Sequence, residues 1–183
     1  MGEINLKRQN KLGLLAVAST VAALANPAYA DSKQGDSEIT IVRPLSFVVD
    51  DNLDFGNVIR GTTAGTVTVA PGGARTGTGG VILANGGGHK PASFAGLGTN
   101  NQRVDISIGS PSILIVGPGA PMRVHSFVMG STPTAVLTTT PRRFRINSAT
   151  GVFAFPVGAT LDVAANQAPG KYTGIWTITL NYF

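Results

Sequence analysis

The C-terminal stretch Tyr172–Phe183, YTGIWTITLNYF, constrains the fold of this chain more than any other segment. Period-two alternation over a β-branched and aromatic run predicts a strand with one buried face. A strand that carries such a face has to pair with another strand, so its partner is the central question. The face expected to be buried holds Tyr172, Gly174, Trp176, Ile178, Leu180 and Tyr182, and the opposite face holds Thr173, Ile175, Thr177, Thr179 and Asn181.

The N-terminal residues 1–30 have the pattern of a secretory signal peptide. Three bases, Lys7, Arg8 and Lys11, precede a short apolar run, and Ala28-Tyr29-Ala30 forms a small-x-small cleavage site after Pro27. The run is too short to span a bilayer, and the less favoured alternative is a buried N-terminal helix. We therefore expect an exported chain of residues 31–183 that forms a single β-sandwich domain with an N-terminal extension, residues 31–43.

Composition points to an all-β fold for the exported chain. The full sequence holds no cysteine, so no disulfide supports the core, and most of its 24 glycines separate segments rich in Thr, Val and Ile. No segment after residue 30 shows a helical stripe. Short strands joined by Gly, Pro and Asn turns predict an antiparallel sandwich or barrel.

Several strands are expected from alternation, and some of them are interrupted. Pro44 cannot donate a ladder hydrogen bond, so the first alternating segment is expected to break into two pieces at Arg43-Pro44. The parity of apolar residues switches within Met122–Met129, which predicts either a bulge or burial on both faces. The other expectations are strands at Glu38–Val42, Leu45–Val49, Thr66–Ala70, Val152–Phe155 and Thr160–Val163, and a flexible loop at Pro71–Gly80.

No motif predicts a catalytic, cofactor or metal site. His89 and His125 show no metal-ligand spacing, and the chain contains neither a GxSxG elbow nor a phosphate-binding glycine motif. A Ser-His-Asp triad remains open, because triads assemble in space. The formal net charge of +5 includes bases of the leader, so we expect no nucleic-acid partner. The arginines of Pro141–Arg145 are interpreted as a solvated strand end.

Three motifs give the chain a resemblance to known families. They are Leu53-Asp54-Phe55-Gly56, Val157-Gly158-Ala159-Thr160-Leu161, and the segment Pro169–Tyr182. With these motifs the chain resembles the exported bacterial family called domain of unknown function 4402. The pattern is also similar to spore-coat-U-like and archaic chaperone–usher pilins.

The resemblance to pilins implies an immunoglobulin-like (pilin-like) antiparallel β-sandwich that lacks its last strand. A periplasmic chaperone, and then the N-terminal extension of the next subunit, would fill the resulting groove by β-strand addition, with export through an outer-membrane usher. By position, the donor is Glu38–Arg43 with Ile39 and Ile41 as its pocket-filling side chains. The acceptor groove or chaperone contacts are Trp176, Ile178, Leu180 and Tyr182.

The function expected from this resemblance is that of a non-enzymatic structural subunit of a bacterial surface fibre, passing through the periplasm to the cell surface. Its partners would be neighbouring copies of itself or related subunits. Many archaic pilins carry a disulfide, whereas this chain has no cysteine, and Arg43-Pro44 interrupts its donor segment. The alternative therefore stays open that Glu38–Val42 pairs within its own chain. The protein would then be a self-complete secreted or periplasmic binding module, for glycans for example.

Overall fold

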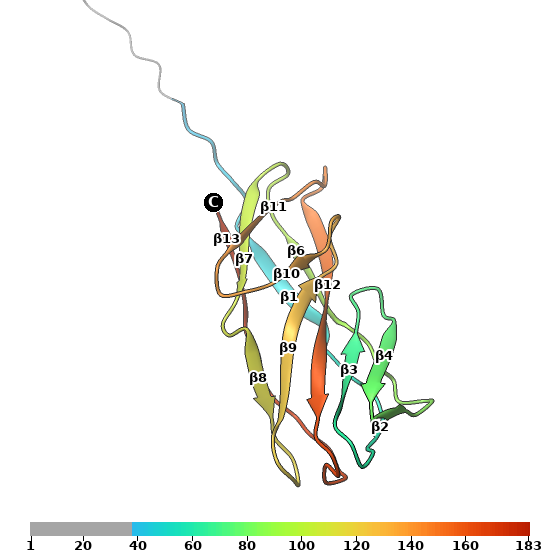
Figure 1. Cartoon of the computed structure of the whole chain (residues 1–183). Coiled ribbons are helices and arrows are strands. Elements are labelled where there is room, and N and C mark those ends of the chain that lie inside the picture. Colours follow the sequence, from blue (N-terminus) through green and yellow to red (C-terminus); the bar gives the residue numbers. More distant parts are fainter. Residues whose placement is uncertain (1–37) are drawn as a thin grey trace, which may run out of the picture. The chain divides into compact units, whose positions relative to one another are not determined.

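The computed structural model describes residues 38–183, and residues 40–183 form one compact unit. The predicted signal peptide, residues 1–30, and residues 31–37 of the predicted extension lie outside the described residues. All regular structure from Thr40 onward is β-strand, and every strand pairing is antiparallel, which confirms the all-β prediction (Figure 1).

The largest sheet is built around the long strand β12 (Val152–Val163) (Figure 1). One edge of β12 pairs first with β6 and then with β3, while its other edge pairs with β9. The remaining strands extend these pairs outward: β1 joins β6, β4 joins β3, and β8 and β10 join β9. Their bounds are β1 (Ser46–Asp51), β3 (Gly65–Val69), β4 (Arg75–Gly79), β6 (Ala92–Leu97), β8 (Ser112–Ile115), β9 (Met122–Met129) and β10 (Ala135–Val136).

A second, three-stranded sheet contains the end of the chain. Its order is β11 (Arg142–Arg145), β7 (Arg103–Ile108) and β13 (Ile178–Tyr182), and β7 leads directly into β8 of the first sheet (Figure 1). A small third pair joins β2 (Val58–Ile59) to β5 (Ile82–Leu83). The arrangement is a sandwich-like stack of antiparallel sheets.

One hydrophobic core lies between the sheets. Side chains from the second sheet, such as Ile106 and Leu180, belong to the same buried cluster as Val67, Phe127 and Val157 of the first. The last three are 0% exposed. Full burial of each such side chain contributes about 1.5–3 kcal/mol, so this core holds the domain together without disulfides.

The parity switch predicted in Met122–Met129 is a β-bulge. Gly158 pairs with Val128 while Thr160 pairs with His125, so β9 holds one more residue than β12 at this point. Ser126 has a left-handed φ of 54° there. The extra residue lets both Val124 and Phe127 face the core, at 2% and 0% exposed.

Two predictions about the middle of the chain are wrong. The expected loop Pro71–Gly80 contains β4, which pairs along the whole of β3 and adds a 2.7 Å hydroxyl contact between Thr66 and Thr78. The two expected strands Val152–Phe155 and Thr160–Val163 are one continuous strand, because Pro156 to Ala159 also pair with neighbouring strands.

Two predictions about the ends of the chain are also corrected. Glu38–Val42 forms no strand, whereas the expected strand Leu45–Val49 corresponds to β1. The C-terminal strand is paired over Ile178–Tyr182 only, with an isolated bridge further back between Thr173 and Val116. The intervening residues 174–177 are extended chain without a strand partner in the described part of the molecule.

Candidate functional site: a groove between two strand edges

A groove of about 1560 Å³ runs between β1 and the C-terminal segment. One rim is Phe47, Val49 and the stretch 51–60, and the other rim is the stretch 167–178. Inward-facing side chains of the first sheet form its floor. These floor residues are Ala92, Phe94, Ile113, Ile115, Met122, Val124, Leu161 and Val163.

Both rims are strand edges with unused backbone groups. β1 pairs with β6 on one side, and β13 pairs with β7 on one side; the described chain supplies no strand for either outer edge. The backbone bonds Gly109 N to Thr177 O and Phe183 N to Arg103 O place the odd-numbered residues of β13 toward β7. The peptide groups of Ile178, Leu180 and Tyr182 therefore point toward the outer edge of β13.

The stretch 174–177 leaves still more backbone unpaired. Within the described residues, only the carbonyl of Thr177 in this stretch has a backbone partner. Gly174 makes close packing against β8 possible, because a Cβ there would lie 2.9 Å from the carbonyl oxygen of Leu114 and 2.8 Å from Ile115 Cγ2. This rim therefore has the properties of an edge strand, with backbone N–H and C=O groups available for pairing on its free side.

The predicted alternation of the C-terminal stretch is confirmed. Leu180 is buried, and Trp176, Ile178 and Tyr182 are half-buried, whereas Ile175 is 90% exposed. Trp176 and Ile178 line the groove, but Leu180 and Tyr182 do not belong to its lining. The structure thus places two of the four predicted acceptor residues in the groove wall and the other two outside it, further along the same segment and on the same face.

Trp176 connects the groove to the core. Its ring stacks on Phe127 with a centroid separation of 4.8 Å and meets Phe94 edge-on at 5.7 Å. Such aromatic pairs contribute about 0.5–1.5 kcal/mol beyond their buried area. The indole is therefore held in one position, and its groove-facing side is a preformed apolar surface.

A tyrosine hydroxyl fixes each end of the C-terminal segment. Tyr172 Oη donates to the carbonyl of Ala168 (2.9 Å) and accepts from Gly119 N (3.0 Å) and Gln167 Nε2 (2.8 Å). Tyr182 Oη donates to the carbonyl of Arg43 (2.8 Å) and accepts from Thr99 N (2.8 Å). These bonds hold the rim at both ends, although its middle has few backbone partners.

The β1 rim carries charge. Asp51 and Asp54 line the groove, and Asp51 forms an ion pair with Lys90 across the β1–β6 side. The hydrogen bond that Lys90 donates to Asp51, reinforced by the charges of Asp51, Asp54 and Asp50, raises the pKa of Lys90, against the opposing effect of desolvation. An apolar floor with a charged rim suits an amphipathic strand better than a uniformly apolar one.

The predicted donor side chains are exposed. Ile39 is 85% exposed and Ile41 is 87% exposed, and neither belongs to a strand. The root of the extension is fixed at Arg43, whose backbone N donates to Thr99 Oγ1 (2.6 Å) and whose guanidinium donates to the carbonyl of Thr150 (3.1 Å).

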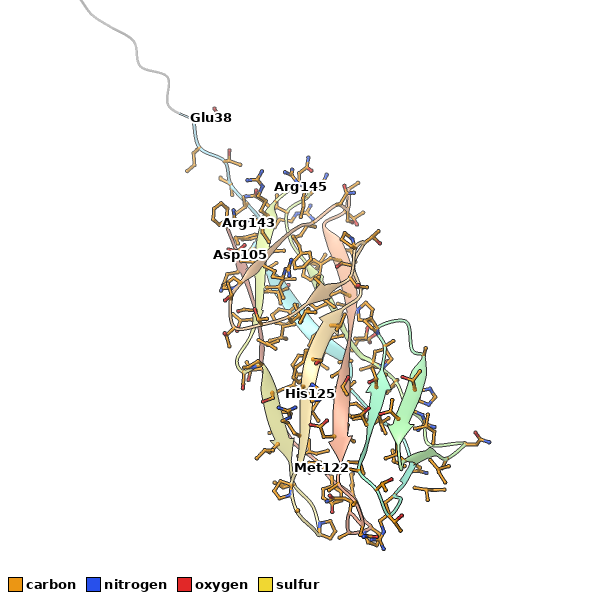
Figure 2. The ribbon with its side chains drawn as sticks, viewed as in Figure 1. Glu38, Asp105, Met122, His125, Arg143 and Arg145 are labelled. Atoms are coloured by element: carbon orange, nitrogen blue, oxygen red, sulfur yellow. The ribbon has the colours of Figure 1, made fainter. Side chains whose placement is uncertain are left out.

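A Ser-His-Asp constellation lies elsewhere, on the outward face of the first sheet. His125 Nδ1 is 2.8 Å from Ser126 Oγ, and Nε2 is 3.0 Å from Asp162 Oδ1. Figure 2 shows His125 in the middle of β9. Asp162 also binds Arg123 (2.9 Å), so its carboxylate is shared. Neither His125 nor Ser126 lines the groove, and no sequence motif pointed to this pairing.

Burial acts to raise the pKa of Asp162, but the hydrogen bonds from Arg123 and His125 outweigh it and hold this pKa below its ordinary value. The carboxylate is therefore kept ionised as an acceptor for two cross-strand donors. This role stabilises the sheet, and it requires no bound substrate.

Two other kinds of site are absent from residues 38–183. No group of three or more His, Asp or Glu side chains is placed to hold a metal ion, and no helix is long and apolar enough to cross a membrane.

The groove rim formed by residues 51–60 contains the Leu53-Asp54-Phe55-Gly56 motif. The alternation of β1 did not reveal that its outer edge would border the same groove as the C-terminal strand.

Comparison with protein families identifies the domain. The model of the family described as domain of unknown function (DUF4402) matches residues 45–182, which include β1, both rims of the groove and β13. The chain therefore belongs to this family. No curated protein matches the chain.

Proposed function

For this member of the family, we propose that the groove accepts an added β-strand from a neighbouring copy, and that the protein is a structural, non-enzymatic subunit of a bacterial surface fibre. The observation that carries the proposal is the groove with unpaired strand edges on both rims. An extended peptide can pair with such an edge through its backbone and place alternate side chains into the apolar floor. The domain would then be an immunoglobulin-like, pilin-like sandwich completed by another chain.

The size of the groove supports a strand as its occupant. Its volume of about 1560 Å³ exceeds the roughly 300–1,000 Å³ of typical small-molecule sites. The long, open form follows the rim from residue 167 to residue 178. A peptide ligand uses this length, whereas a compact metabolite would leave most of it empty.

The extension supplies a matching donor. Ile39 and Ile41 are two residues apart, so in an extended strand they project from the same face, and both are exposed in the isolated chain. Glu38–Arg43 of one copy would lie along the rim of another, with Ile39 and Ile41 over the floor beside Trp176. Because each copy has one donor and one groove, this contact is heterologous and extends into a filament.

Export to the cell surface fits the same proposal. The groove would need cover before assembly, since an exposed strand edge over an apolar floor promotes uncontrolled association. A periplasmic chaperone that lends a strand, and an outer-membrane usher that exchanges it, are the partners this chemistry requires. Trp176 and Ile178, which line the groove, would form the face against which either strand packs, whereas Leu180 and Tyr182 lie outside the lining.

Substituting Ile39 and Ile41 by Asp in the exported chain, residues 31–183, tests the proposal. We expect the purified wild-type chain to form polymers on size-exclusion chromatography and the variants to remain monomeric, because a carboxylate cannot enter the apolar floor without a partner. Thr40→Asp/Val42→Asp is the matched control, since it adds the same two charges on the opposite face and should still polymerise. Polymerisation of the Ile39→Asp/Ile41→Asp variant at the wild-type rate would contradict the proposal.

The second candidate is a self-complete binding module whose groove takes an external ligand such as a glycan. The charged rim at Asp51 and Asp54 favours it, because polar ligands need such groups for orientation. In that case the wild-type exported chain stays monomeric at all concentrations, and glycan-array binding is lost on substituting Trp176. A wild-type chain that polymerises through Ile39 and Ile41 excludes this candidate.

A further inference from the structure

We propose that Arg43 is a fixed pivot for the donor segment and that Tyr182, on the groove strand of the same copy, is the positioning residue that holds it. The inference rests on the proposed function and adds a residue that orients the donor without contacting the acceptor groove. The strand that receives a neighbour's donor would thereby set the direction in which the copy's own donor leaves the domain.

The hydrogen bonds around Arg43 carry this inference. Its carbonyl accepts from Tyr182 Oη (2.8 Å), and its N–H donates to Thr99 Oγ1 (2.6 Å). Its guanidinium donates to the carbonyl of Thr150 (3.1 Å). An exposed residue outside any strand is thus tied through its backbone to the Thr99 loop and to the last strand of the second sheet, and through its side chain to the Thr150 loop.

Tyr182 is itself fixed from three directions. Its backbone belongs to β13, whose partner is β7, and its hydroxyl accepts from Thr99 N (2.8 Å) while donating to Arg43. Thr99 therefore bonds both partners of the contact, since its backbone N–H binds Tyr182 and its hydroxyl binds Arg43. Tyr182, Thr99 and Arg43 form a closed triangle of hydrogen bonds, which we call the pivot.

Pro44 stiffens the chain directly after the pivot. Its ring fixes its own φ and restricts the backbone of Arg43 to extended conformations. The segment before the pivot is of the opposite kind, because Ile41 and Val42 belong to no strand and are exposed. Within the described residues 38–43, the first point at which the extension is tied to the domain is therefore Arg43, and its orientation there decides where Ile41 can reach.

A pivot helps assembly by reducing the conformations that the donor has to give up. Each backbone residue fixed in one conformation costs roughly 1–2 kcal/mol in entropy, so orienting the root in advance leaves less to lose on docking. A donor without a fixed root would still fit the groove, but would find it more slowly. The pivot therefore affects the assembly of whole copies, and it does not affect the affinity of the groove for a separate donor peptide.

The experiment uses the exported chain with one added cysteine, Glu38→Cys, as a unique fluorophore site, because the protein has no other cysteine. Residue 38 lies on the opposite parity from Ile39 and Ile41. Fluorescence anisotropy of the monomer reports motion of the extension, light scattering reports assembly, and binding of a synthetic peptide of residues 31–43 reports the groove. The variants are Tyr182→Phe and Thr99→Val, with Thr99→Ser to restore the hydroxyl.

We expect Tyr182→Phe and Thr99→Val to lower the anisotropy and to slow assembly about 5-fold, the factor that corresponds to one lost hydrogen bond of about 1 kcal/mol. Peptide affinity should stay within about twofold, and Thr99→Ser should regain the wild-type rate. Thr68→Val is the matched control, since it removes the same kind of hydroxyl from the outer sheet face. It should leave the anisotropy and the assembly rate unchanged.

Two results would overturn the pivot. One is wild-type anisotropy and assembly in both Tyr182→Phe and Thr99→Val. The other is a loss of peptide affinity equal to the loss in assembly rate, because Tyr182 would then act in the groove itself. If the wild-type chain neither assembles nor binds the peptide, the proposed function is wrong. The anisotropy comparison still decides whether Tyr182 holds Arg43.

Discussion

The outer face of the first sheet and the groove differ in how completely their strands are paired. On the outer face, one row of polar side chains crosses four strands in register: Thr76, Thr68, Thr160 and His125. Of these four strands β3, β12 and β9 are paired on both sides and β4 is an edge strand, and the side chains bond across the ladder, as Thr68 and Thr160 do at 2.9 Å. At the groove, β1 and β13 each lack a neighbour on one side within the described chain.

Under the proposed function, the difference explains how one domain can be stable and still accept an added strand. Pairing along β12 fixes the core, so we expect the domain to fold without an occupant in the groove. The C-terminal segment that forms one rim is instead anchored by three side chains: Tyr172, Trp176 and, at its end, Tyr182. If this is correct, substitutions at those points should destabilise the domain far more than substitutions that break a pair on the outer face.

The largest effect is expected from Trp176→Ala. Removing the indole exposes Phe94 and Phe127 and leaves a cavity open to the groove, at a cost of about 3 kcal/mol in the free energy of unfolding. Urea denaturation followed by circular dichroism measures it. Ile175→Ala is the control on the next residue, because its side chain is 90% exposed and its loss should cost less than about 0.5 kcal/mol. Equal losses would mean that Trp176 does not anchor the rim.

Tyr172→Phe is expected to come next, at about 2 kcal/mol. The substitution keeps the ring but leaves the carbonyl of Ala168 and the N–H of Gly119 without their partner, and it removes one of two bonds to the buried amide of Gln167. Tyr182→Phe removes two bonds in a more exposed place and should cost about 1 kcal/mol in the same urea titration. A smaller loss for Tyr172→Phe than for Tyr182→Phe would refute this ranking.

The sequence predicted the faces of the strands better than their partners. Alternation in Tyr172–Phe183 correctly assigned Leu180 to the core and Ile175 to the surface, because side-chain direction follows from strand geometry alone. Alternation could not show that the pairing of the C-terminal segment with β7 stops at Gly109. That break depends on β8 turning to join β9, which is a tertiary event.

Glycine content misled the prediction for Pro71–Gly80. Gly77 and Gly79 suggest a flexible loop, yet both lie in β4. A Cβ on Gly77 would lie 3.3 Å from the side chains of Val81 and Leu83, so the glycine lets neighbouring side chains approach the strand closely. The reverse happened at Glu38–Val42, where alternation suggested a strand and the structure has none. A strand pattern specifies which face of a segment is apolar, but it does not specify the strand with which that segment pairs.

Acid should weaken the outer face through Asp162. Since its pKa in the folded protein is lowered, the stabilisation by this carboxylate is present above its unfolded pKa near 4 and is lost as pH falls through the folded value. Asp162→Asn should cost about 0.2–1 kcal/mol near pH 7, because the side chain is 39% exposed and solvent screens the pair. Urea titrations of both proteins should show this difference shrinking below about pH 4. A constant difference across pH would contradict the assignment.

The smallest effect is expected from the threonine pair on the outer face. Thr68 and Thr160 lie directly opposite each other, and such cross-strand pairs contribute roughly 0.2–1 kcal/mol. A double-mutant cycle with Thr68→Val and Thr160→Val measures their coupling in isolation. Valine keeps the shape and the strand propensity, so the double variant should unfold within about 0.5 kcal/mol of wild type even though each single variant is weaker. A loss in the double variant as large as that of Trp176→Ala would show that the closed face, and not the rim, is where this domain is most vulnerable.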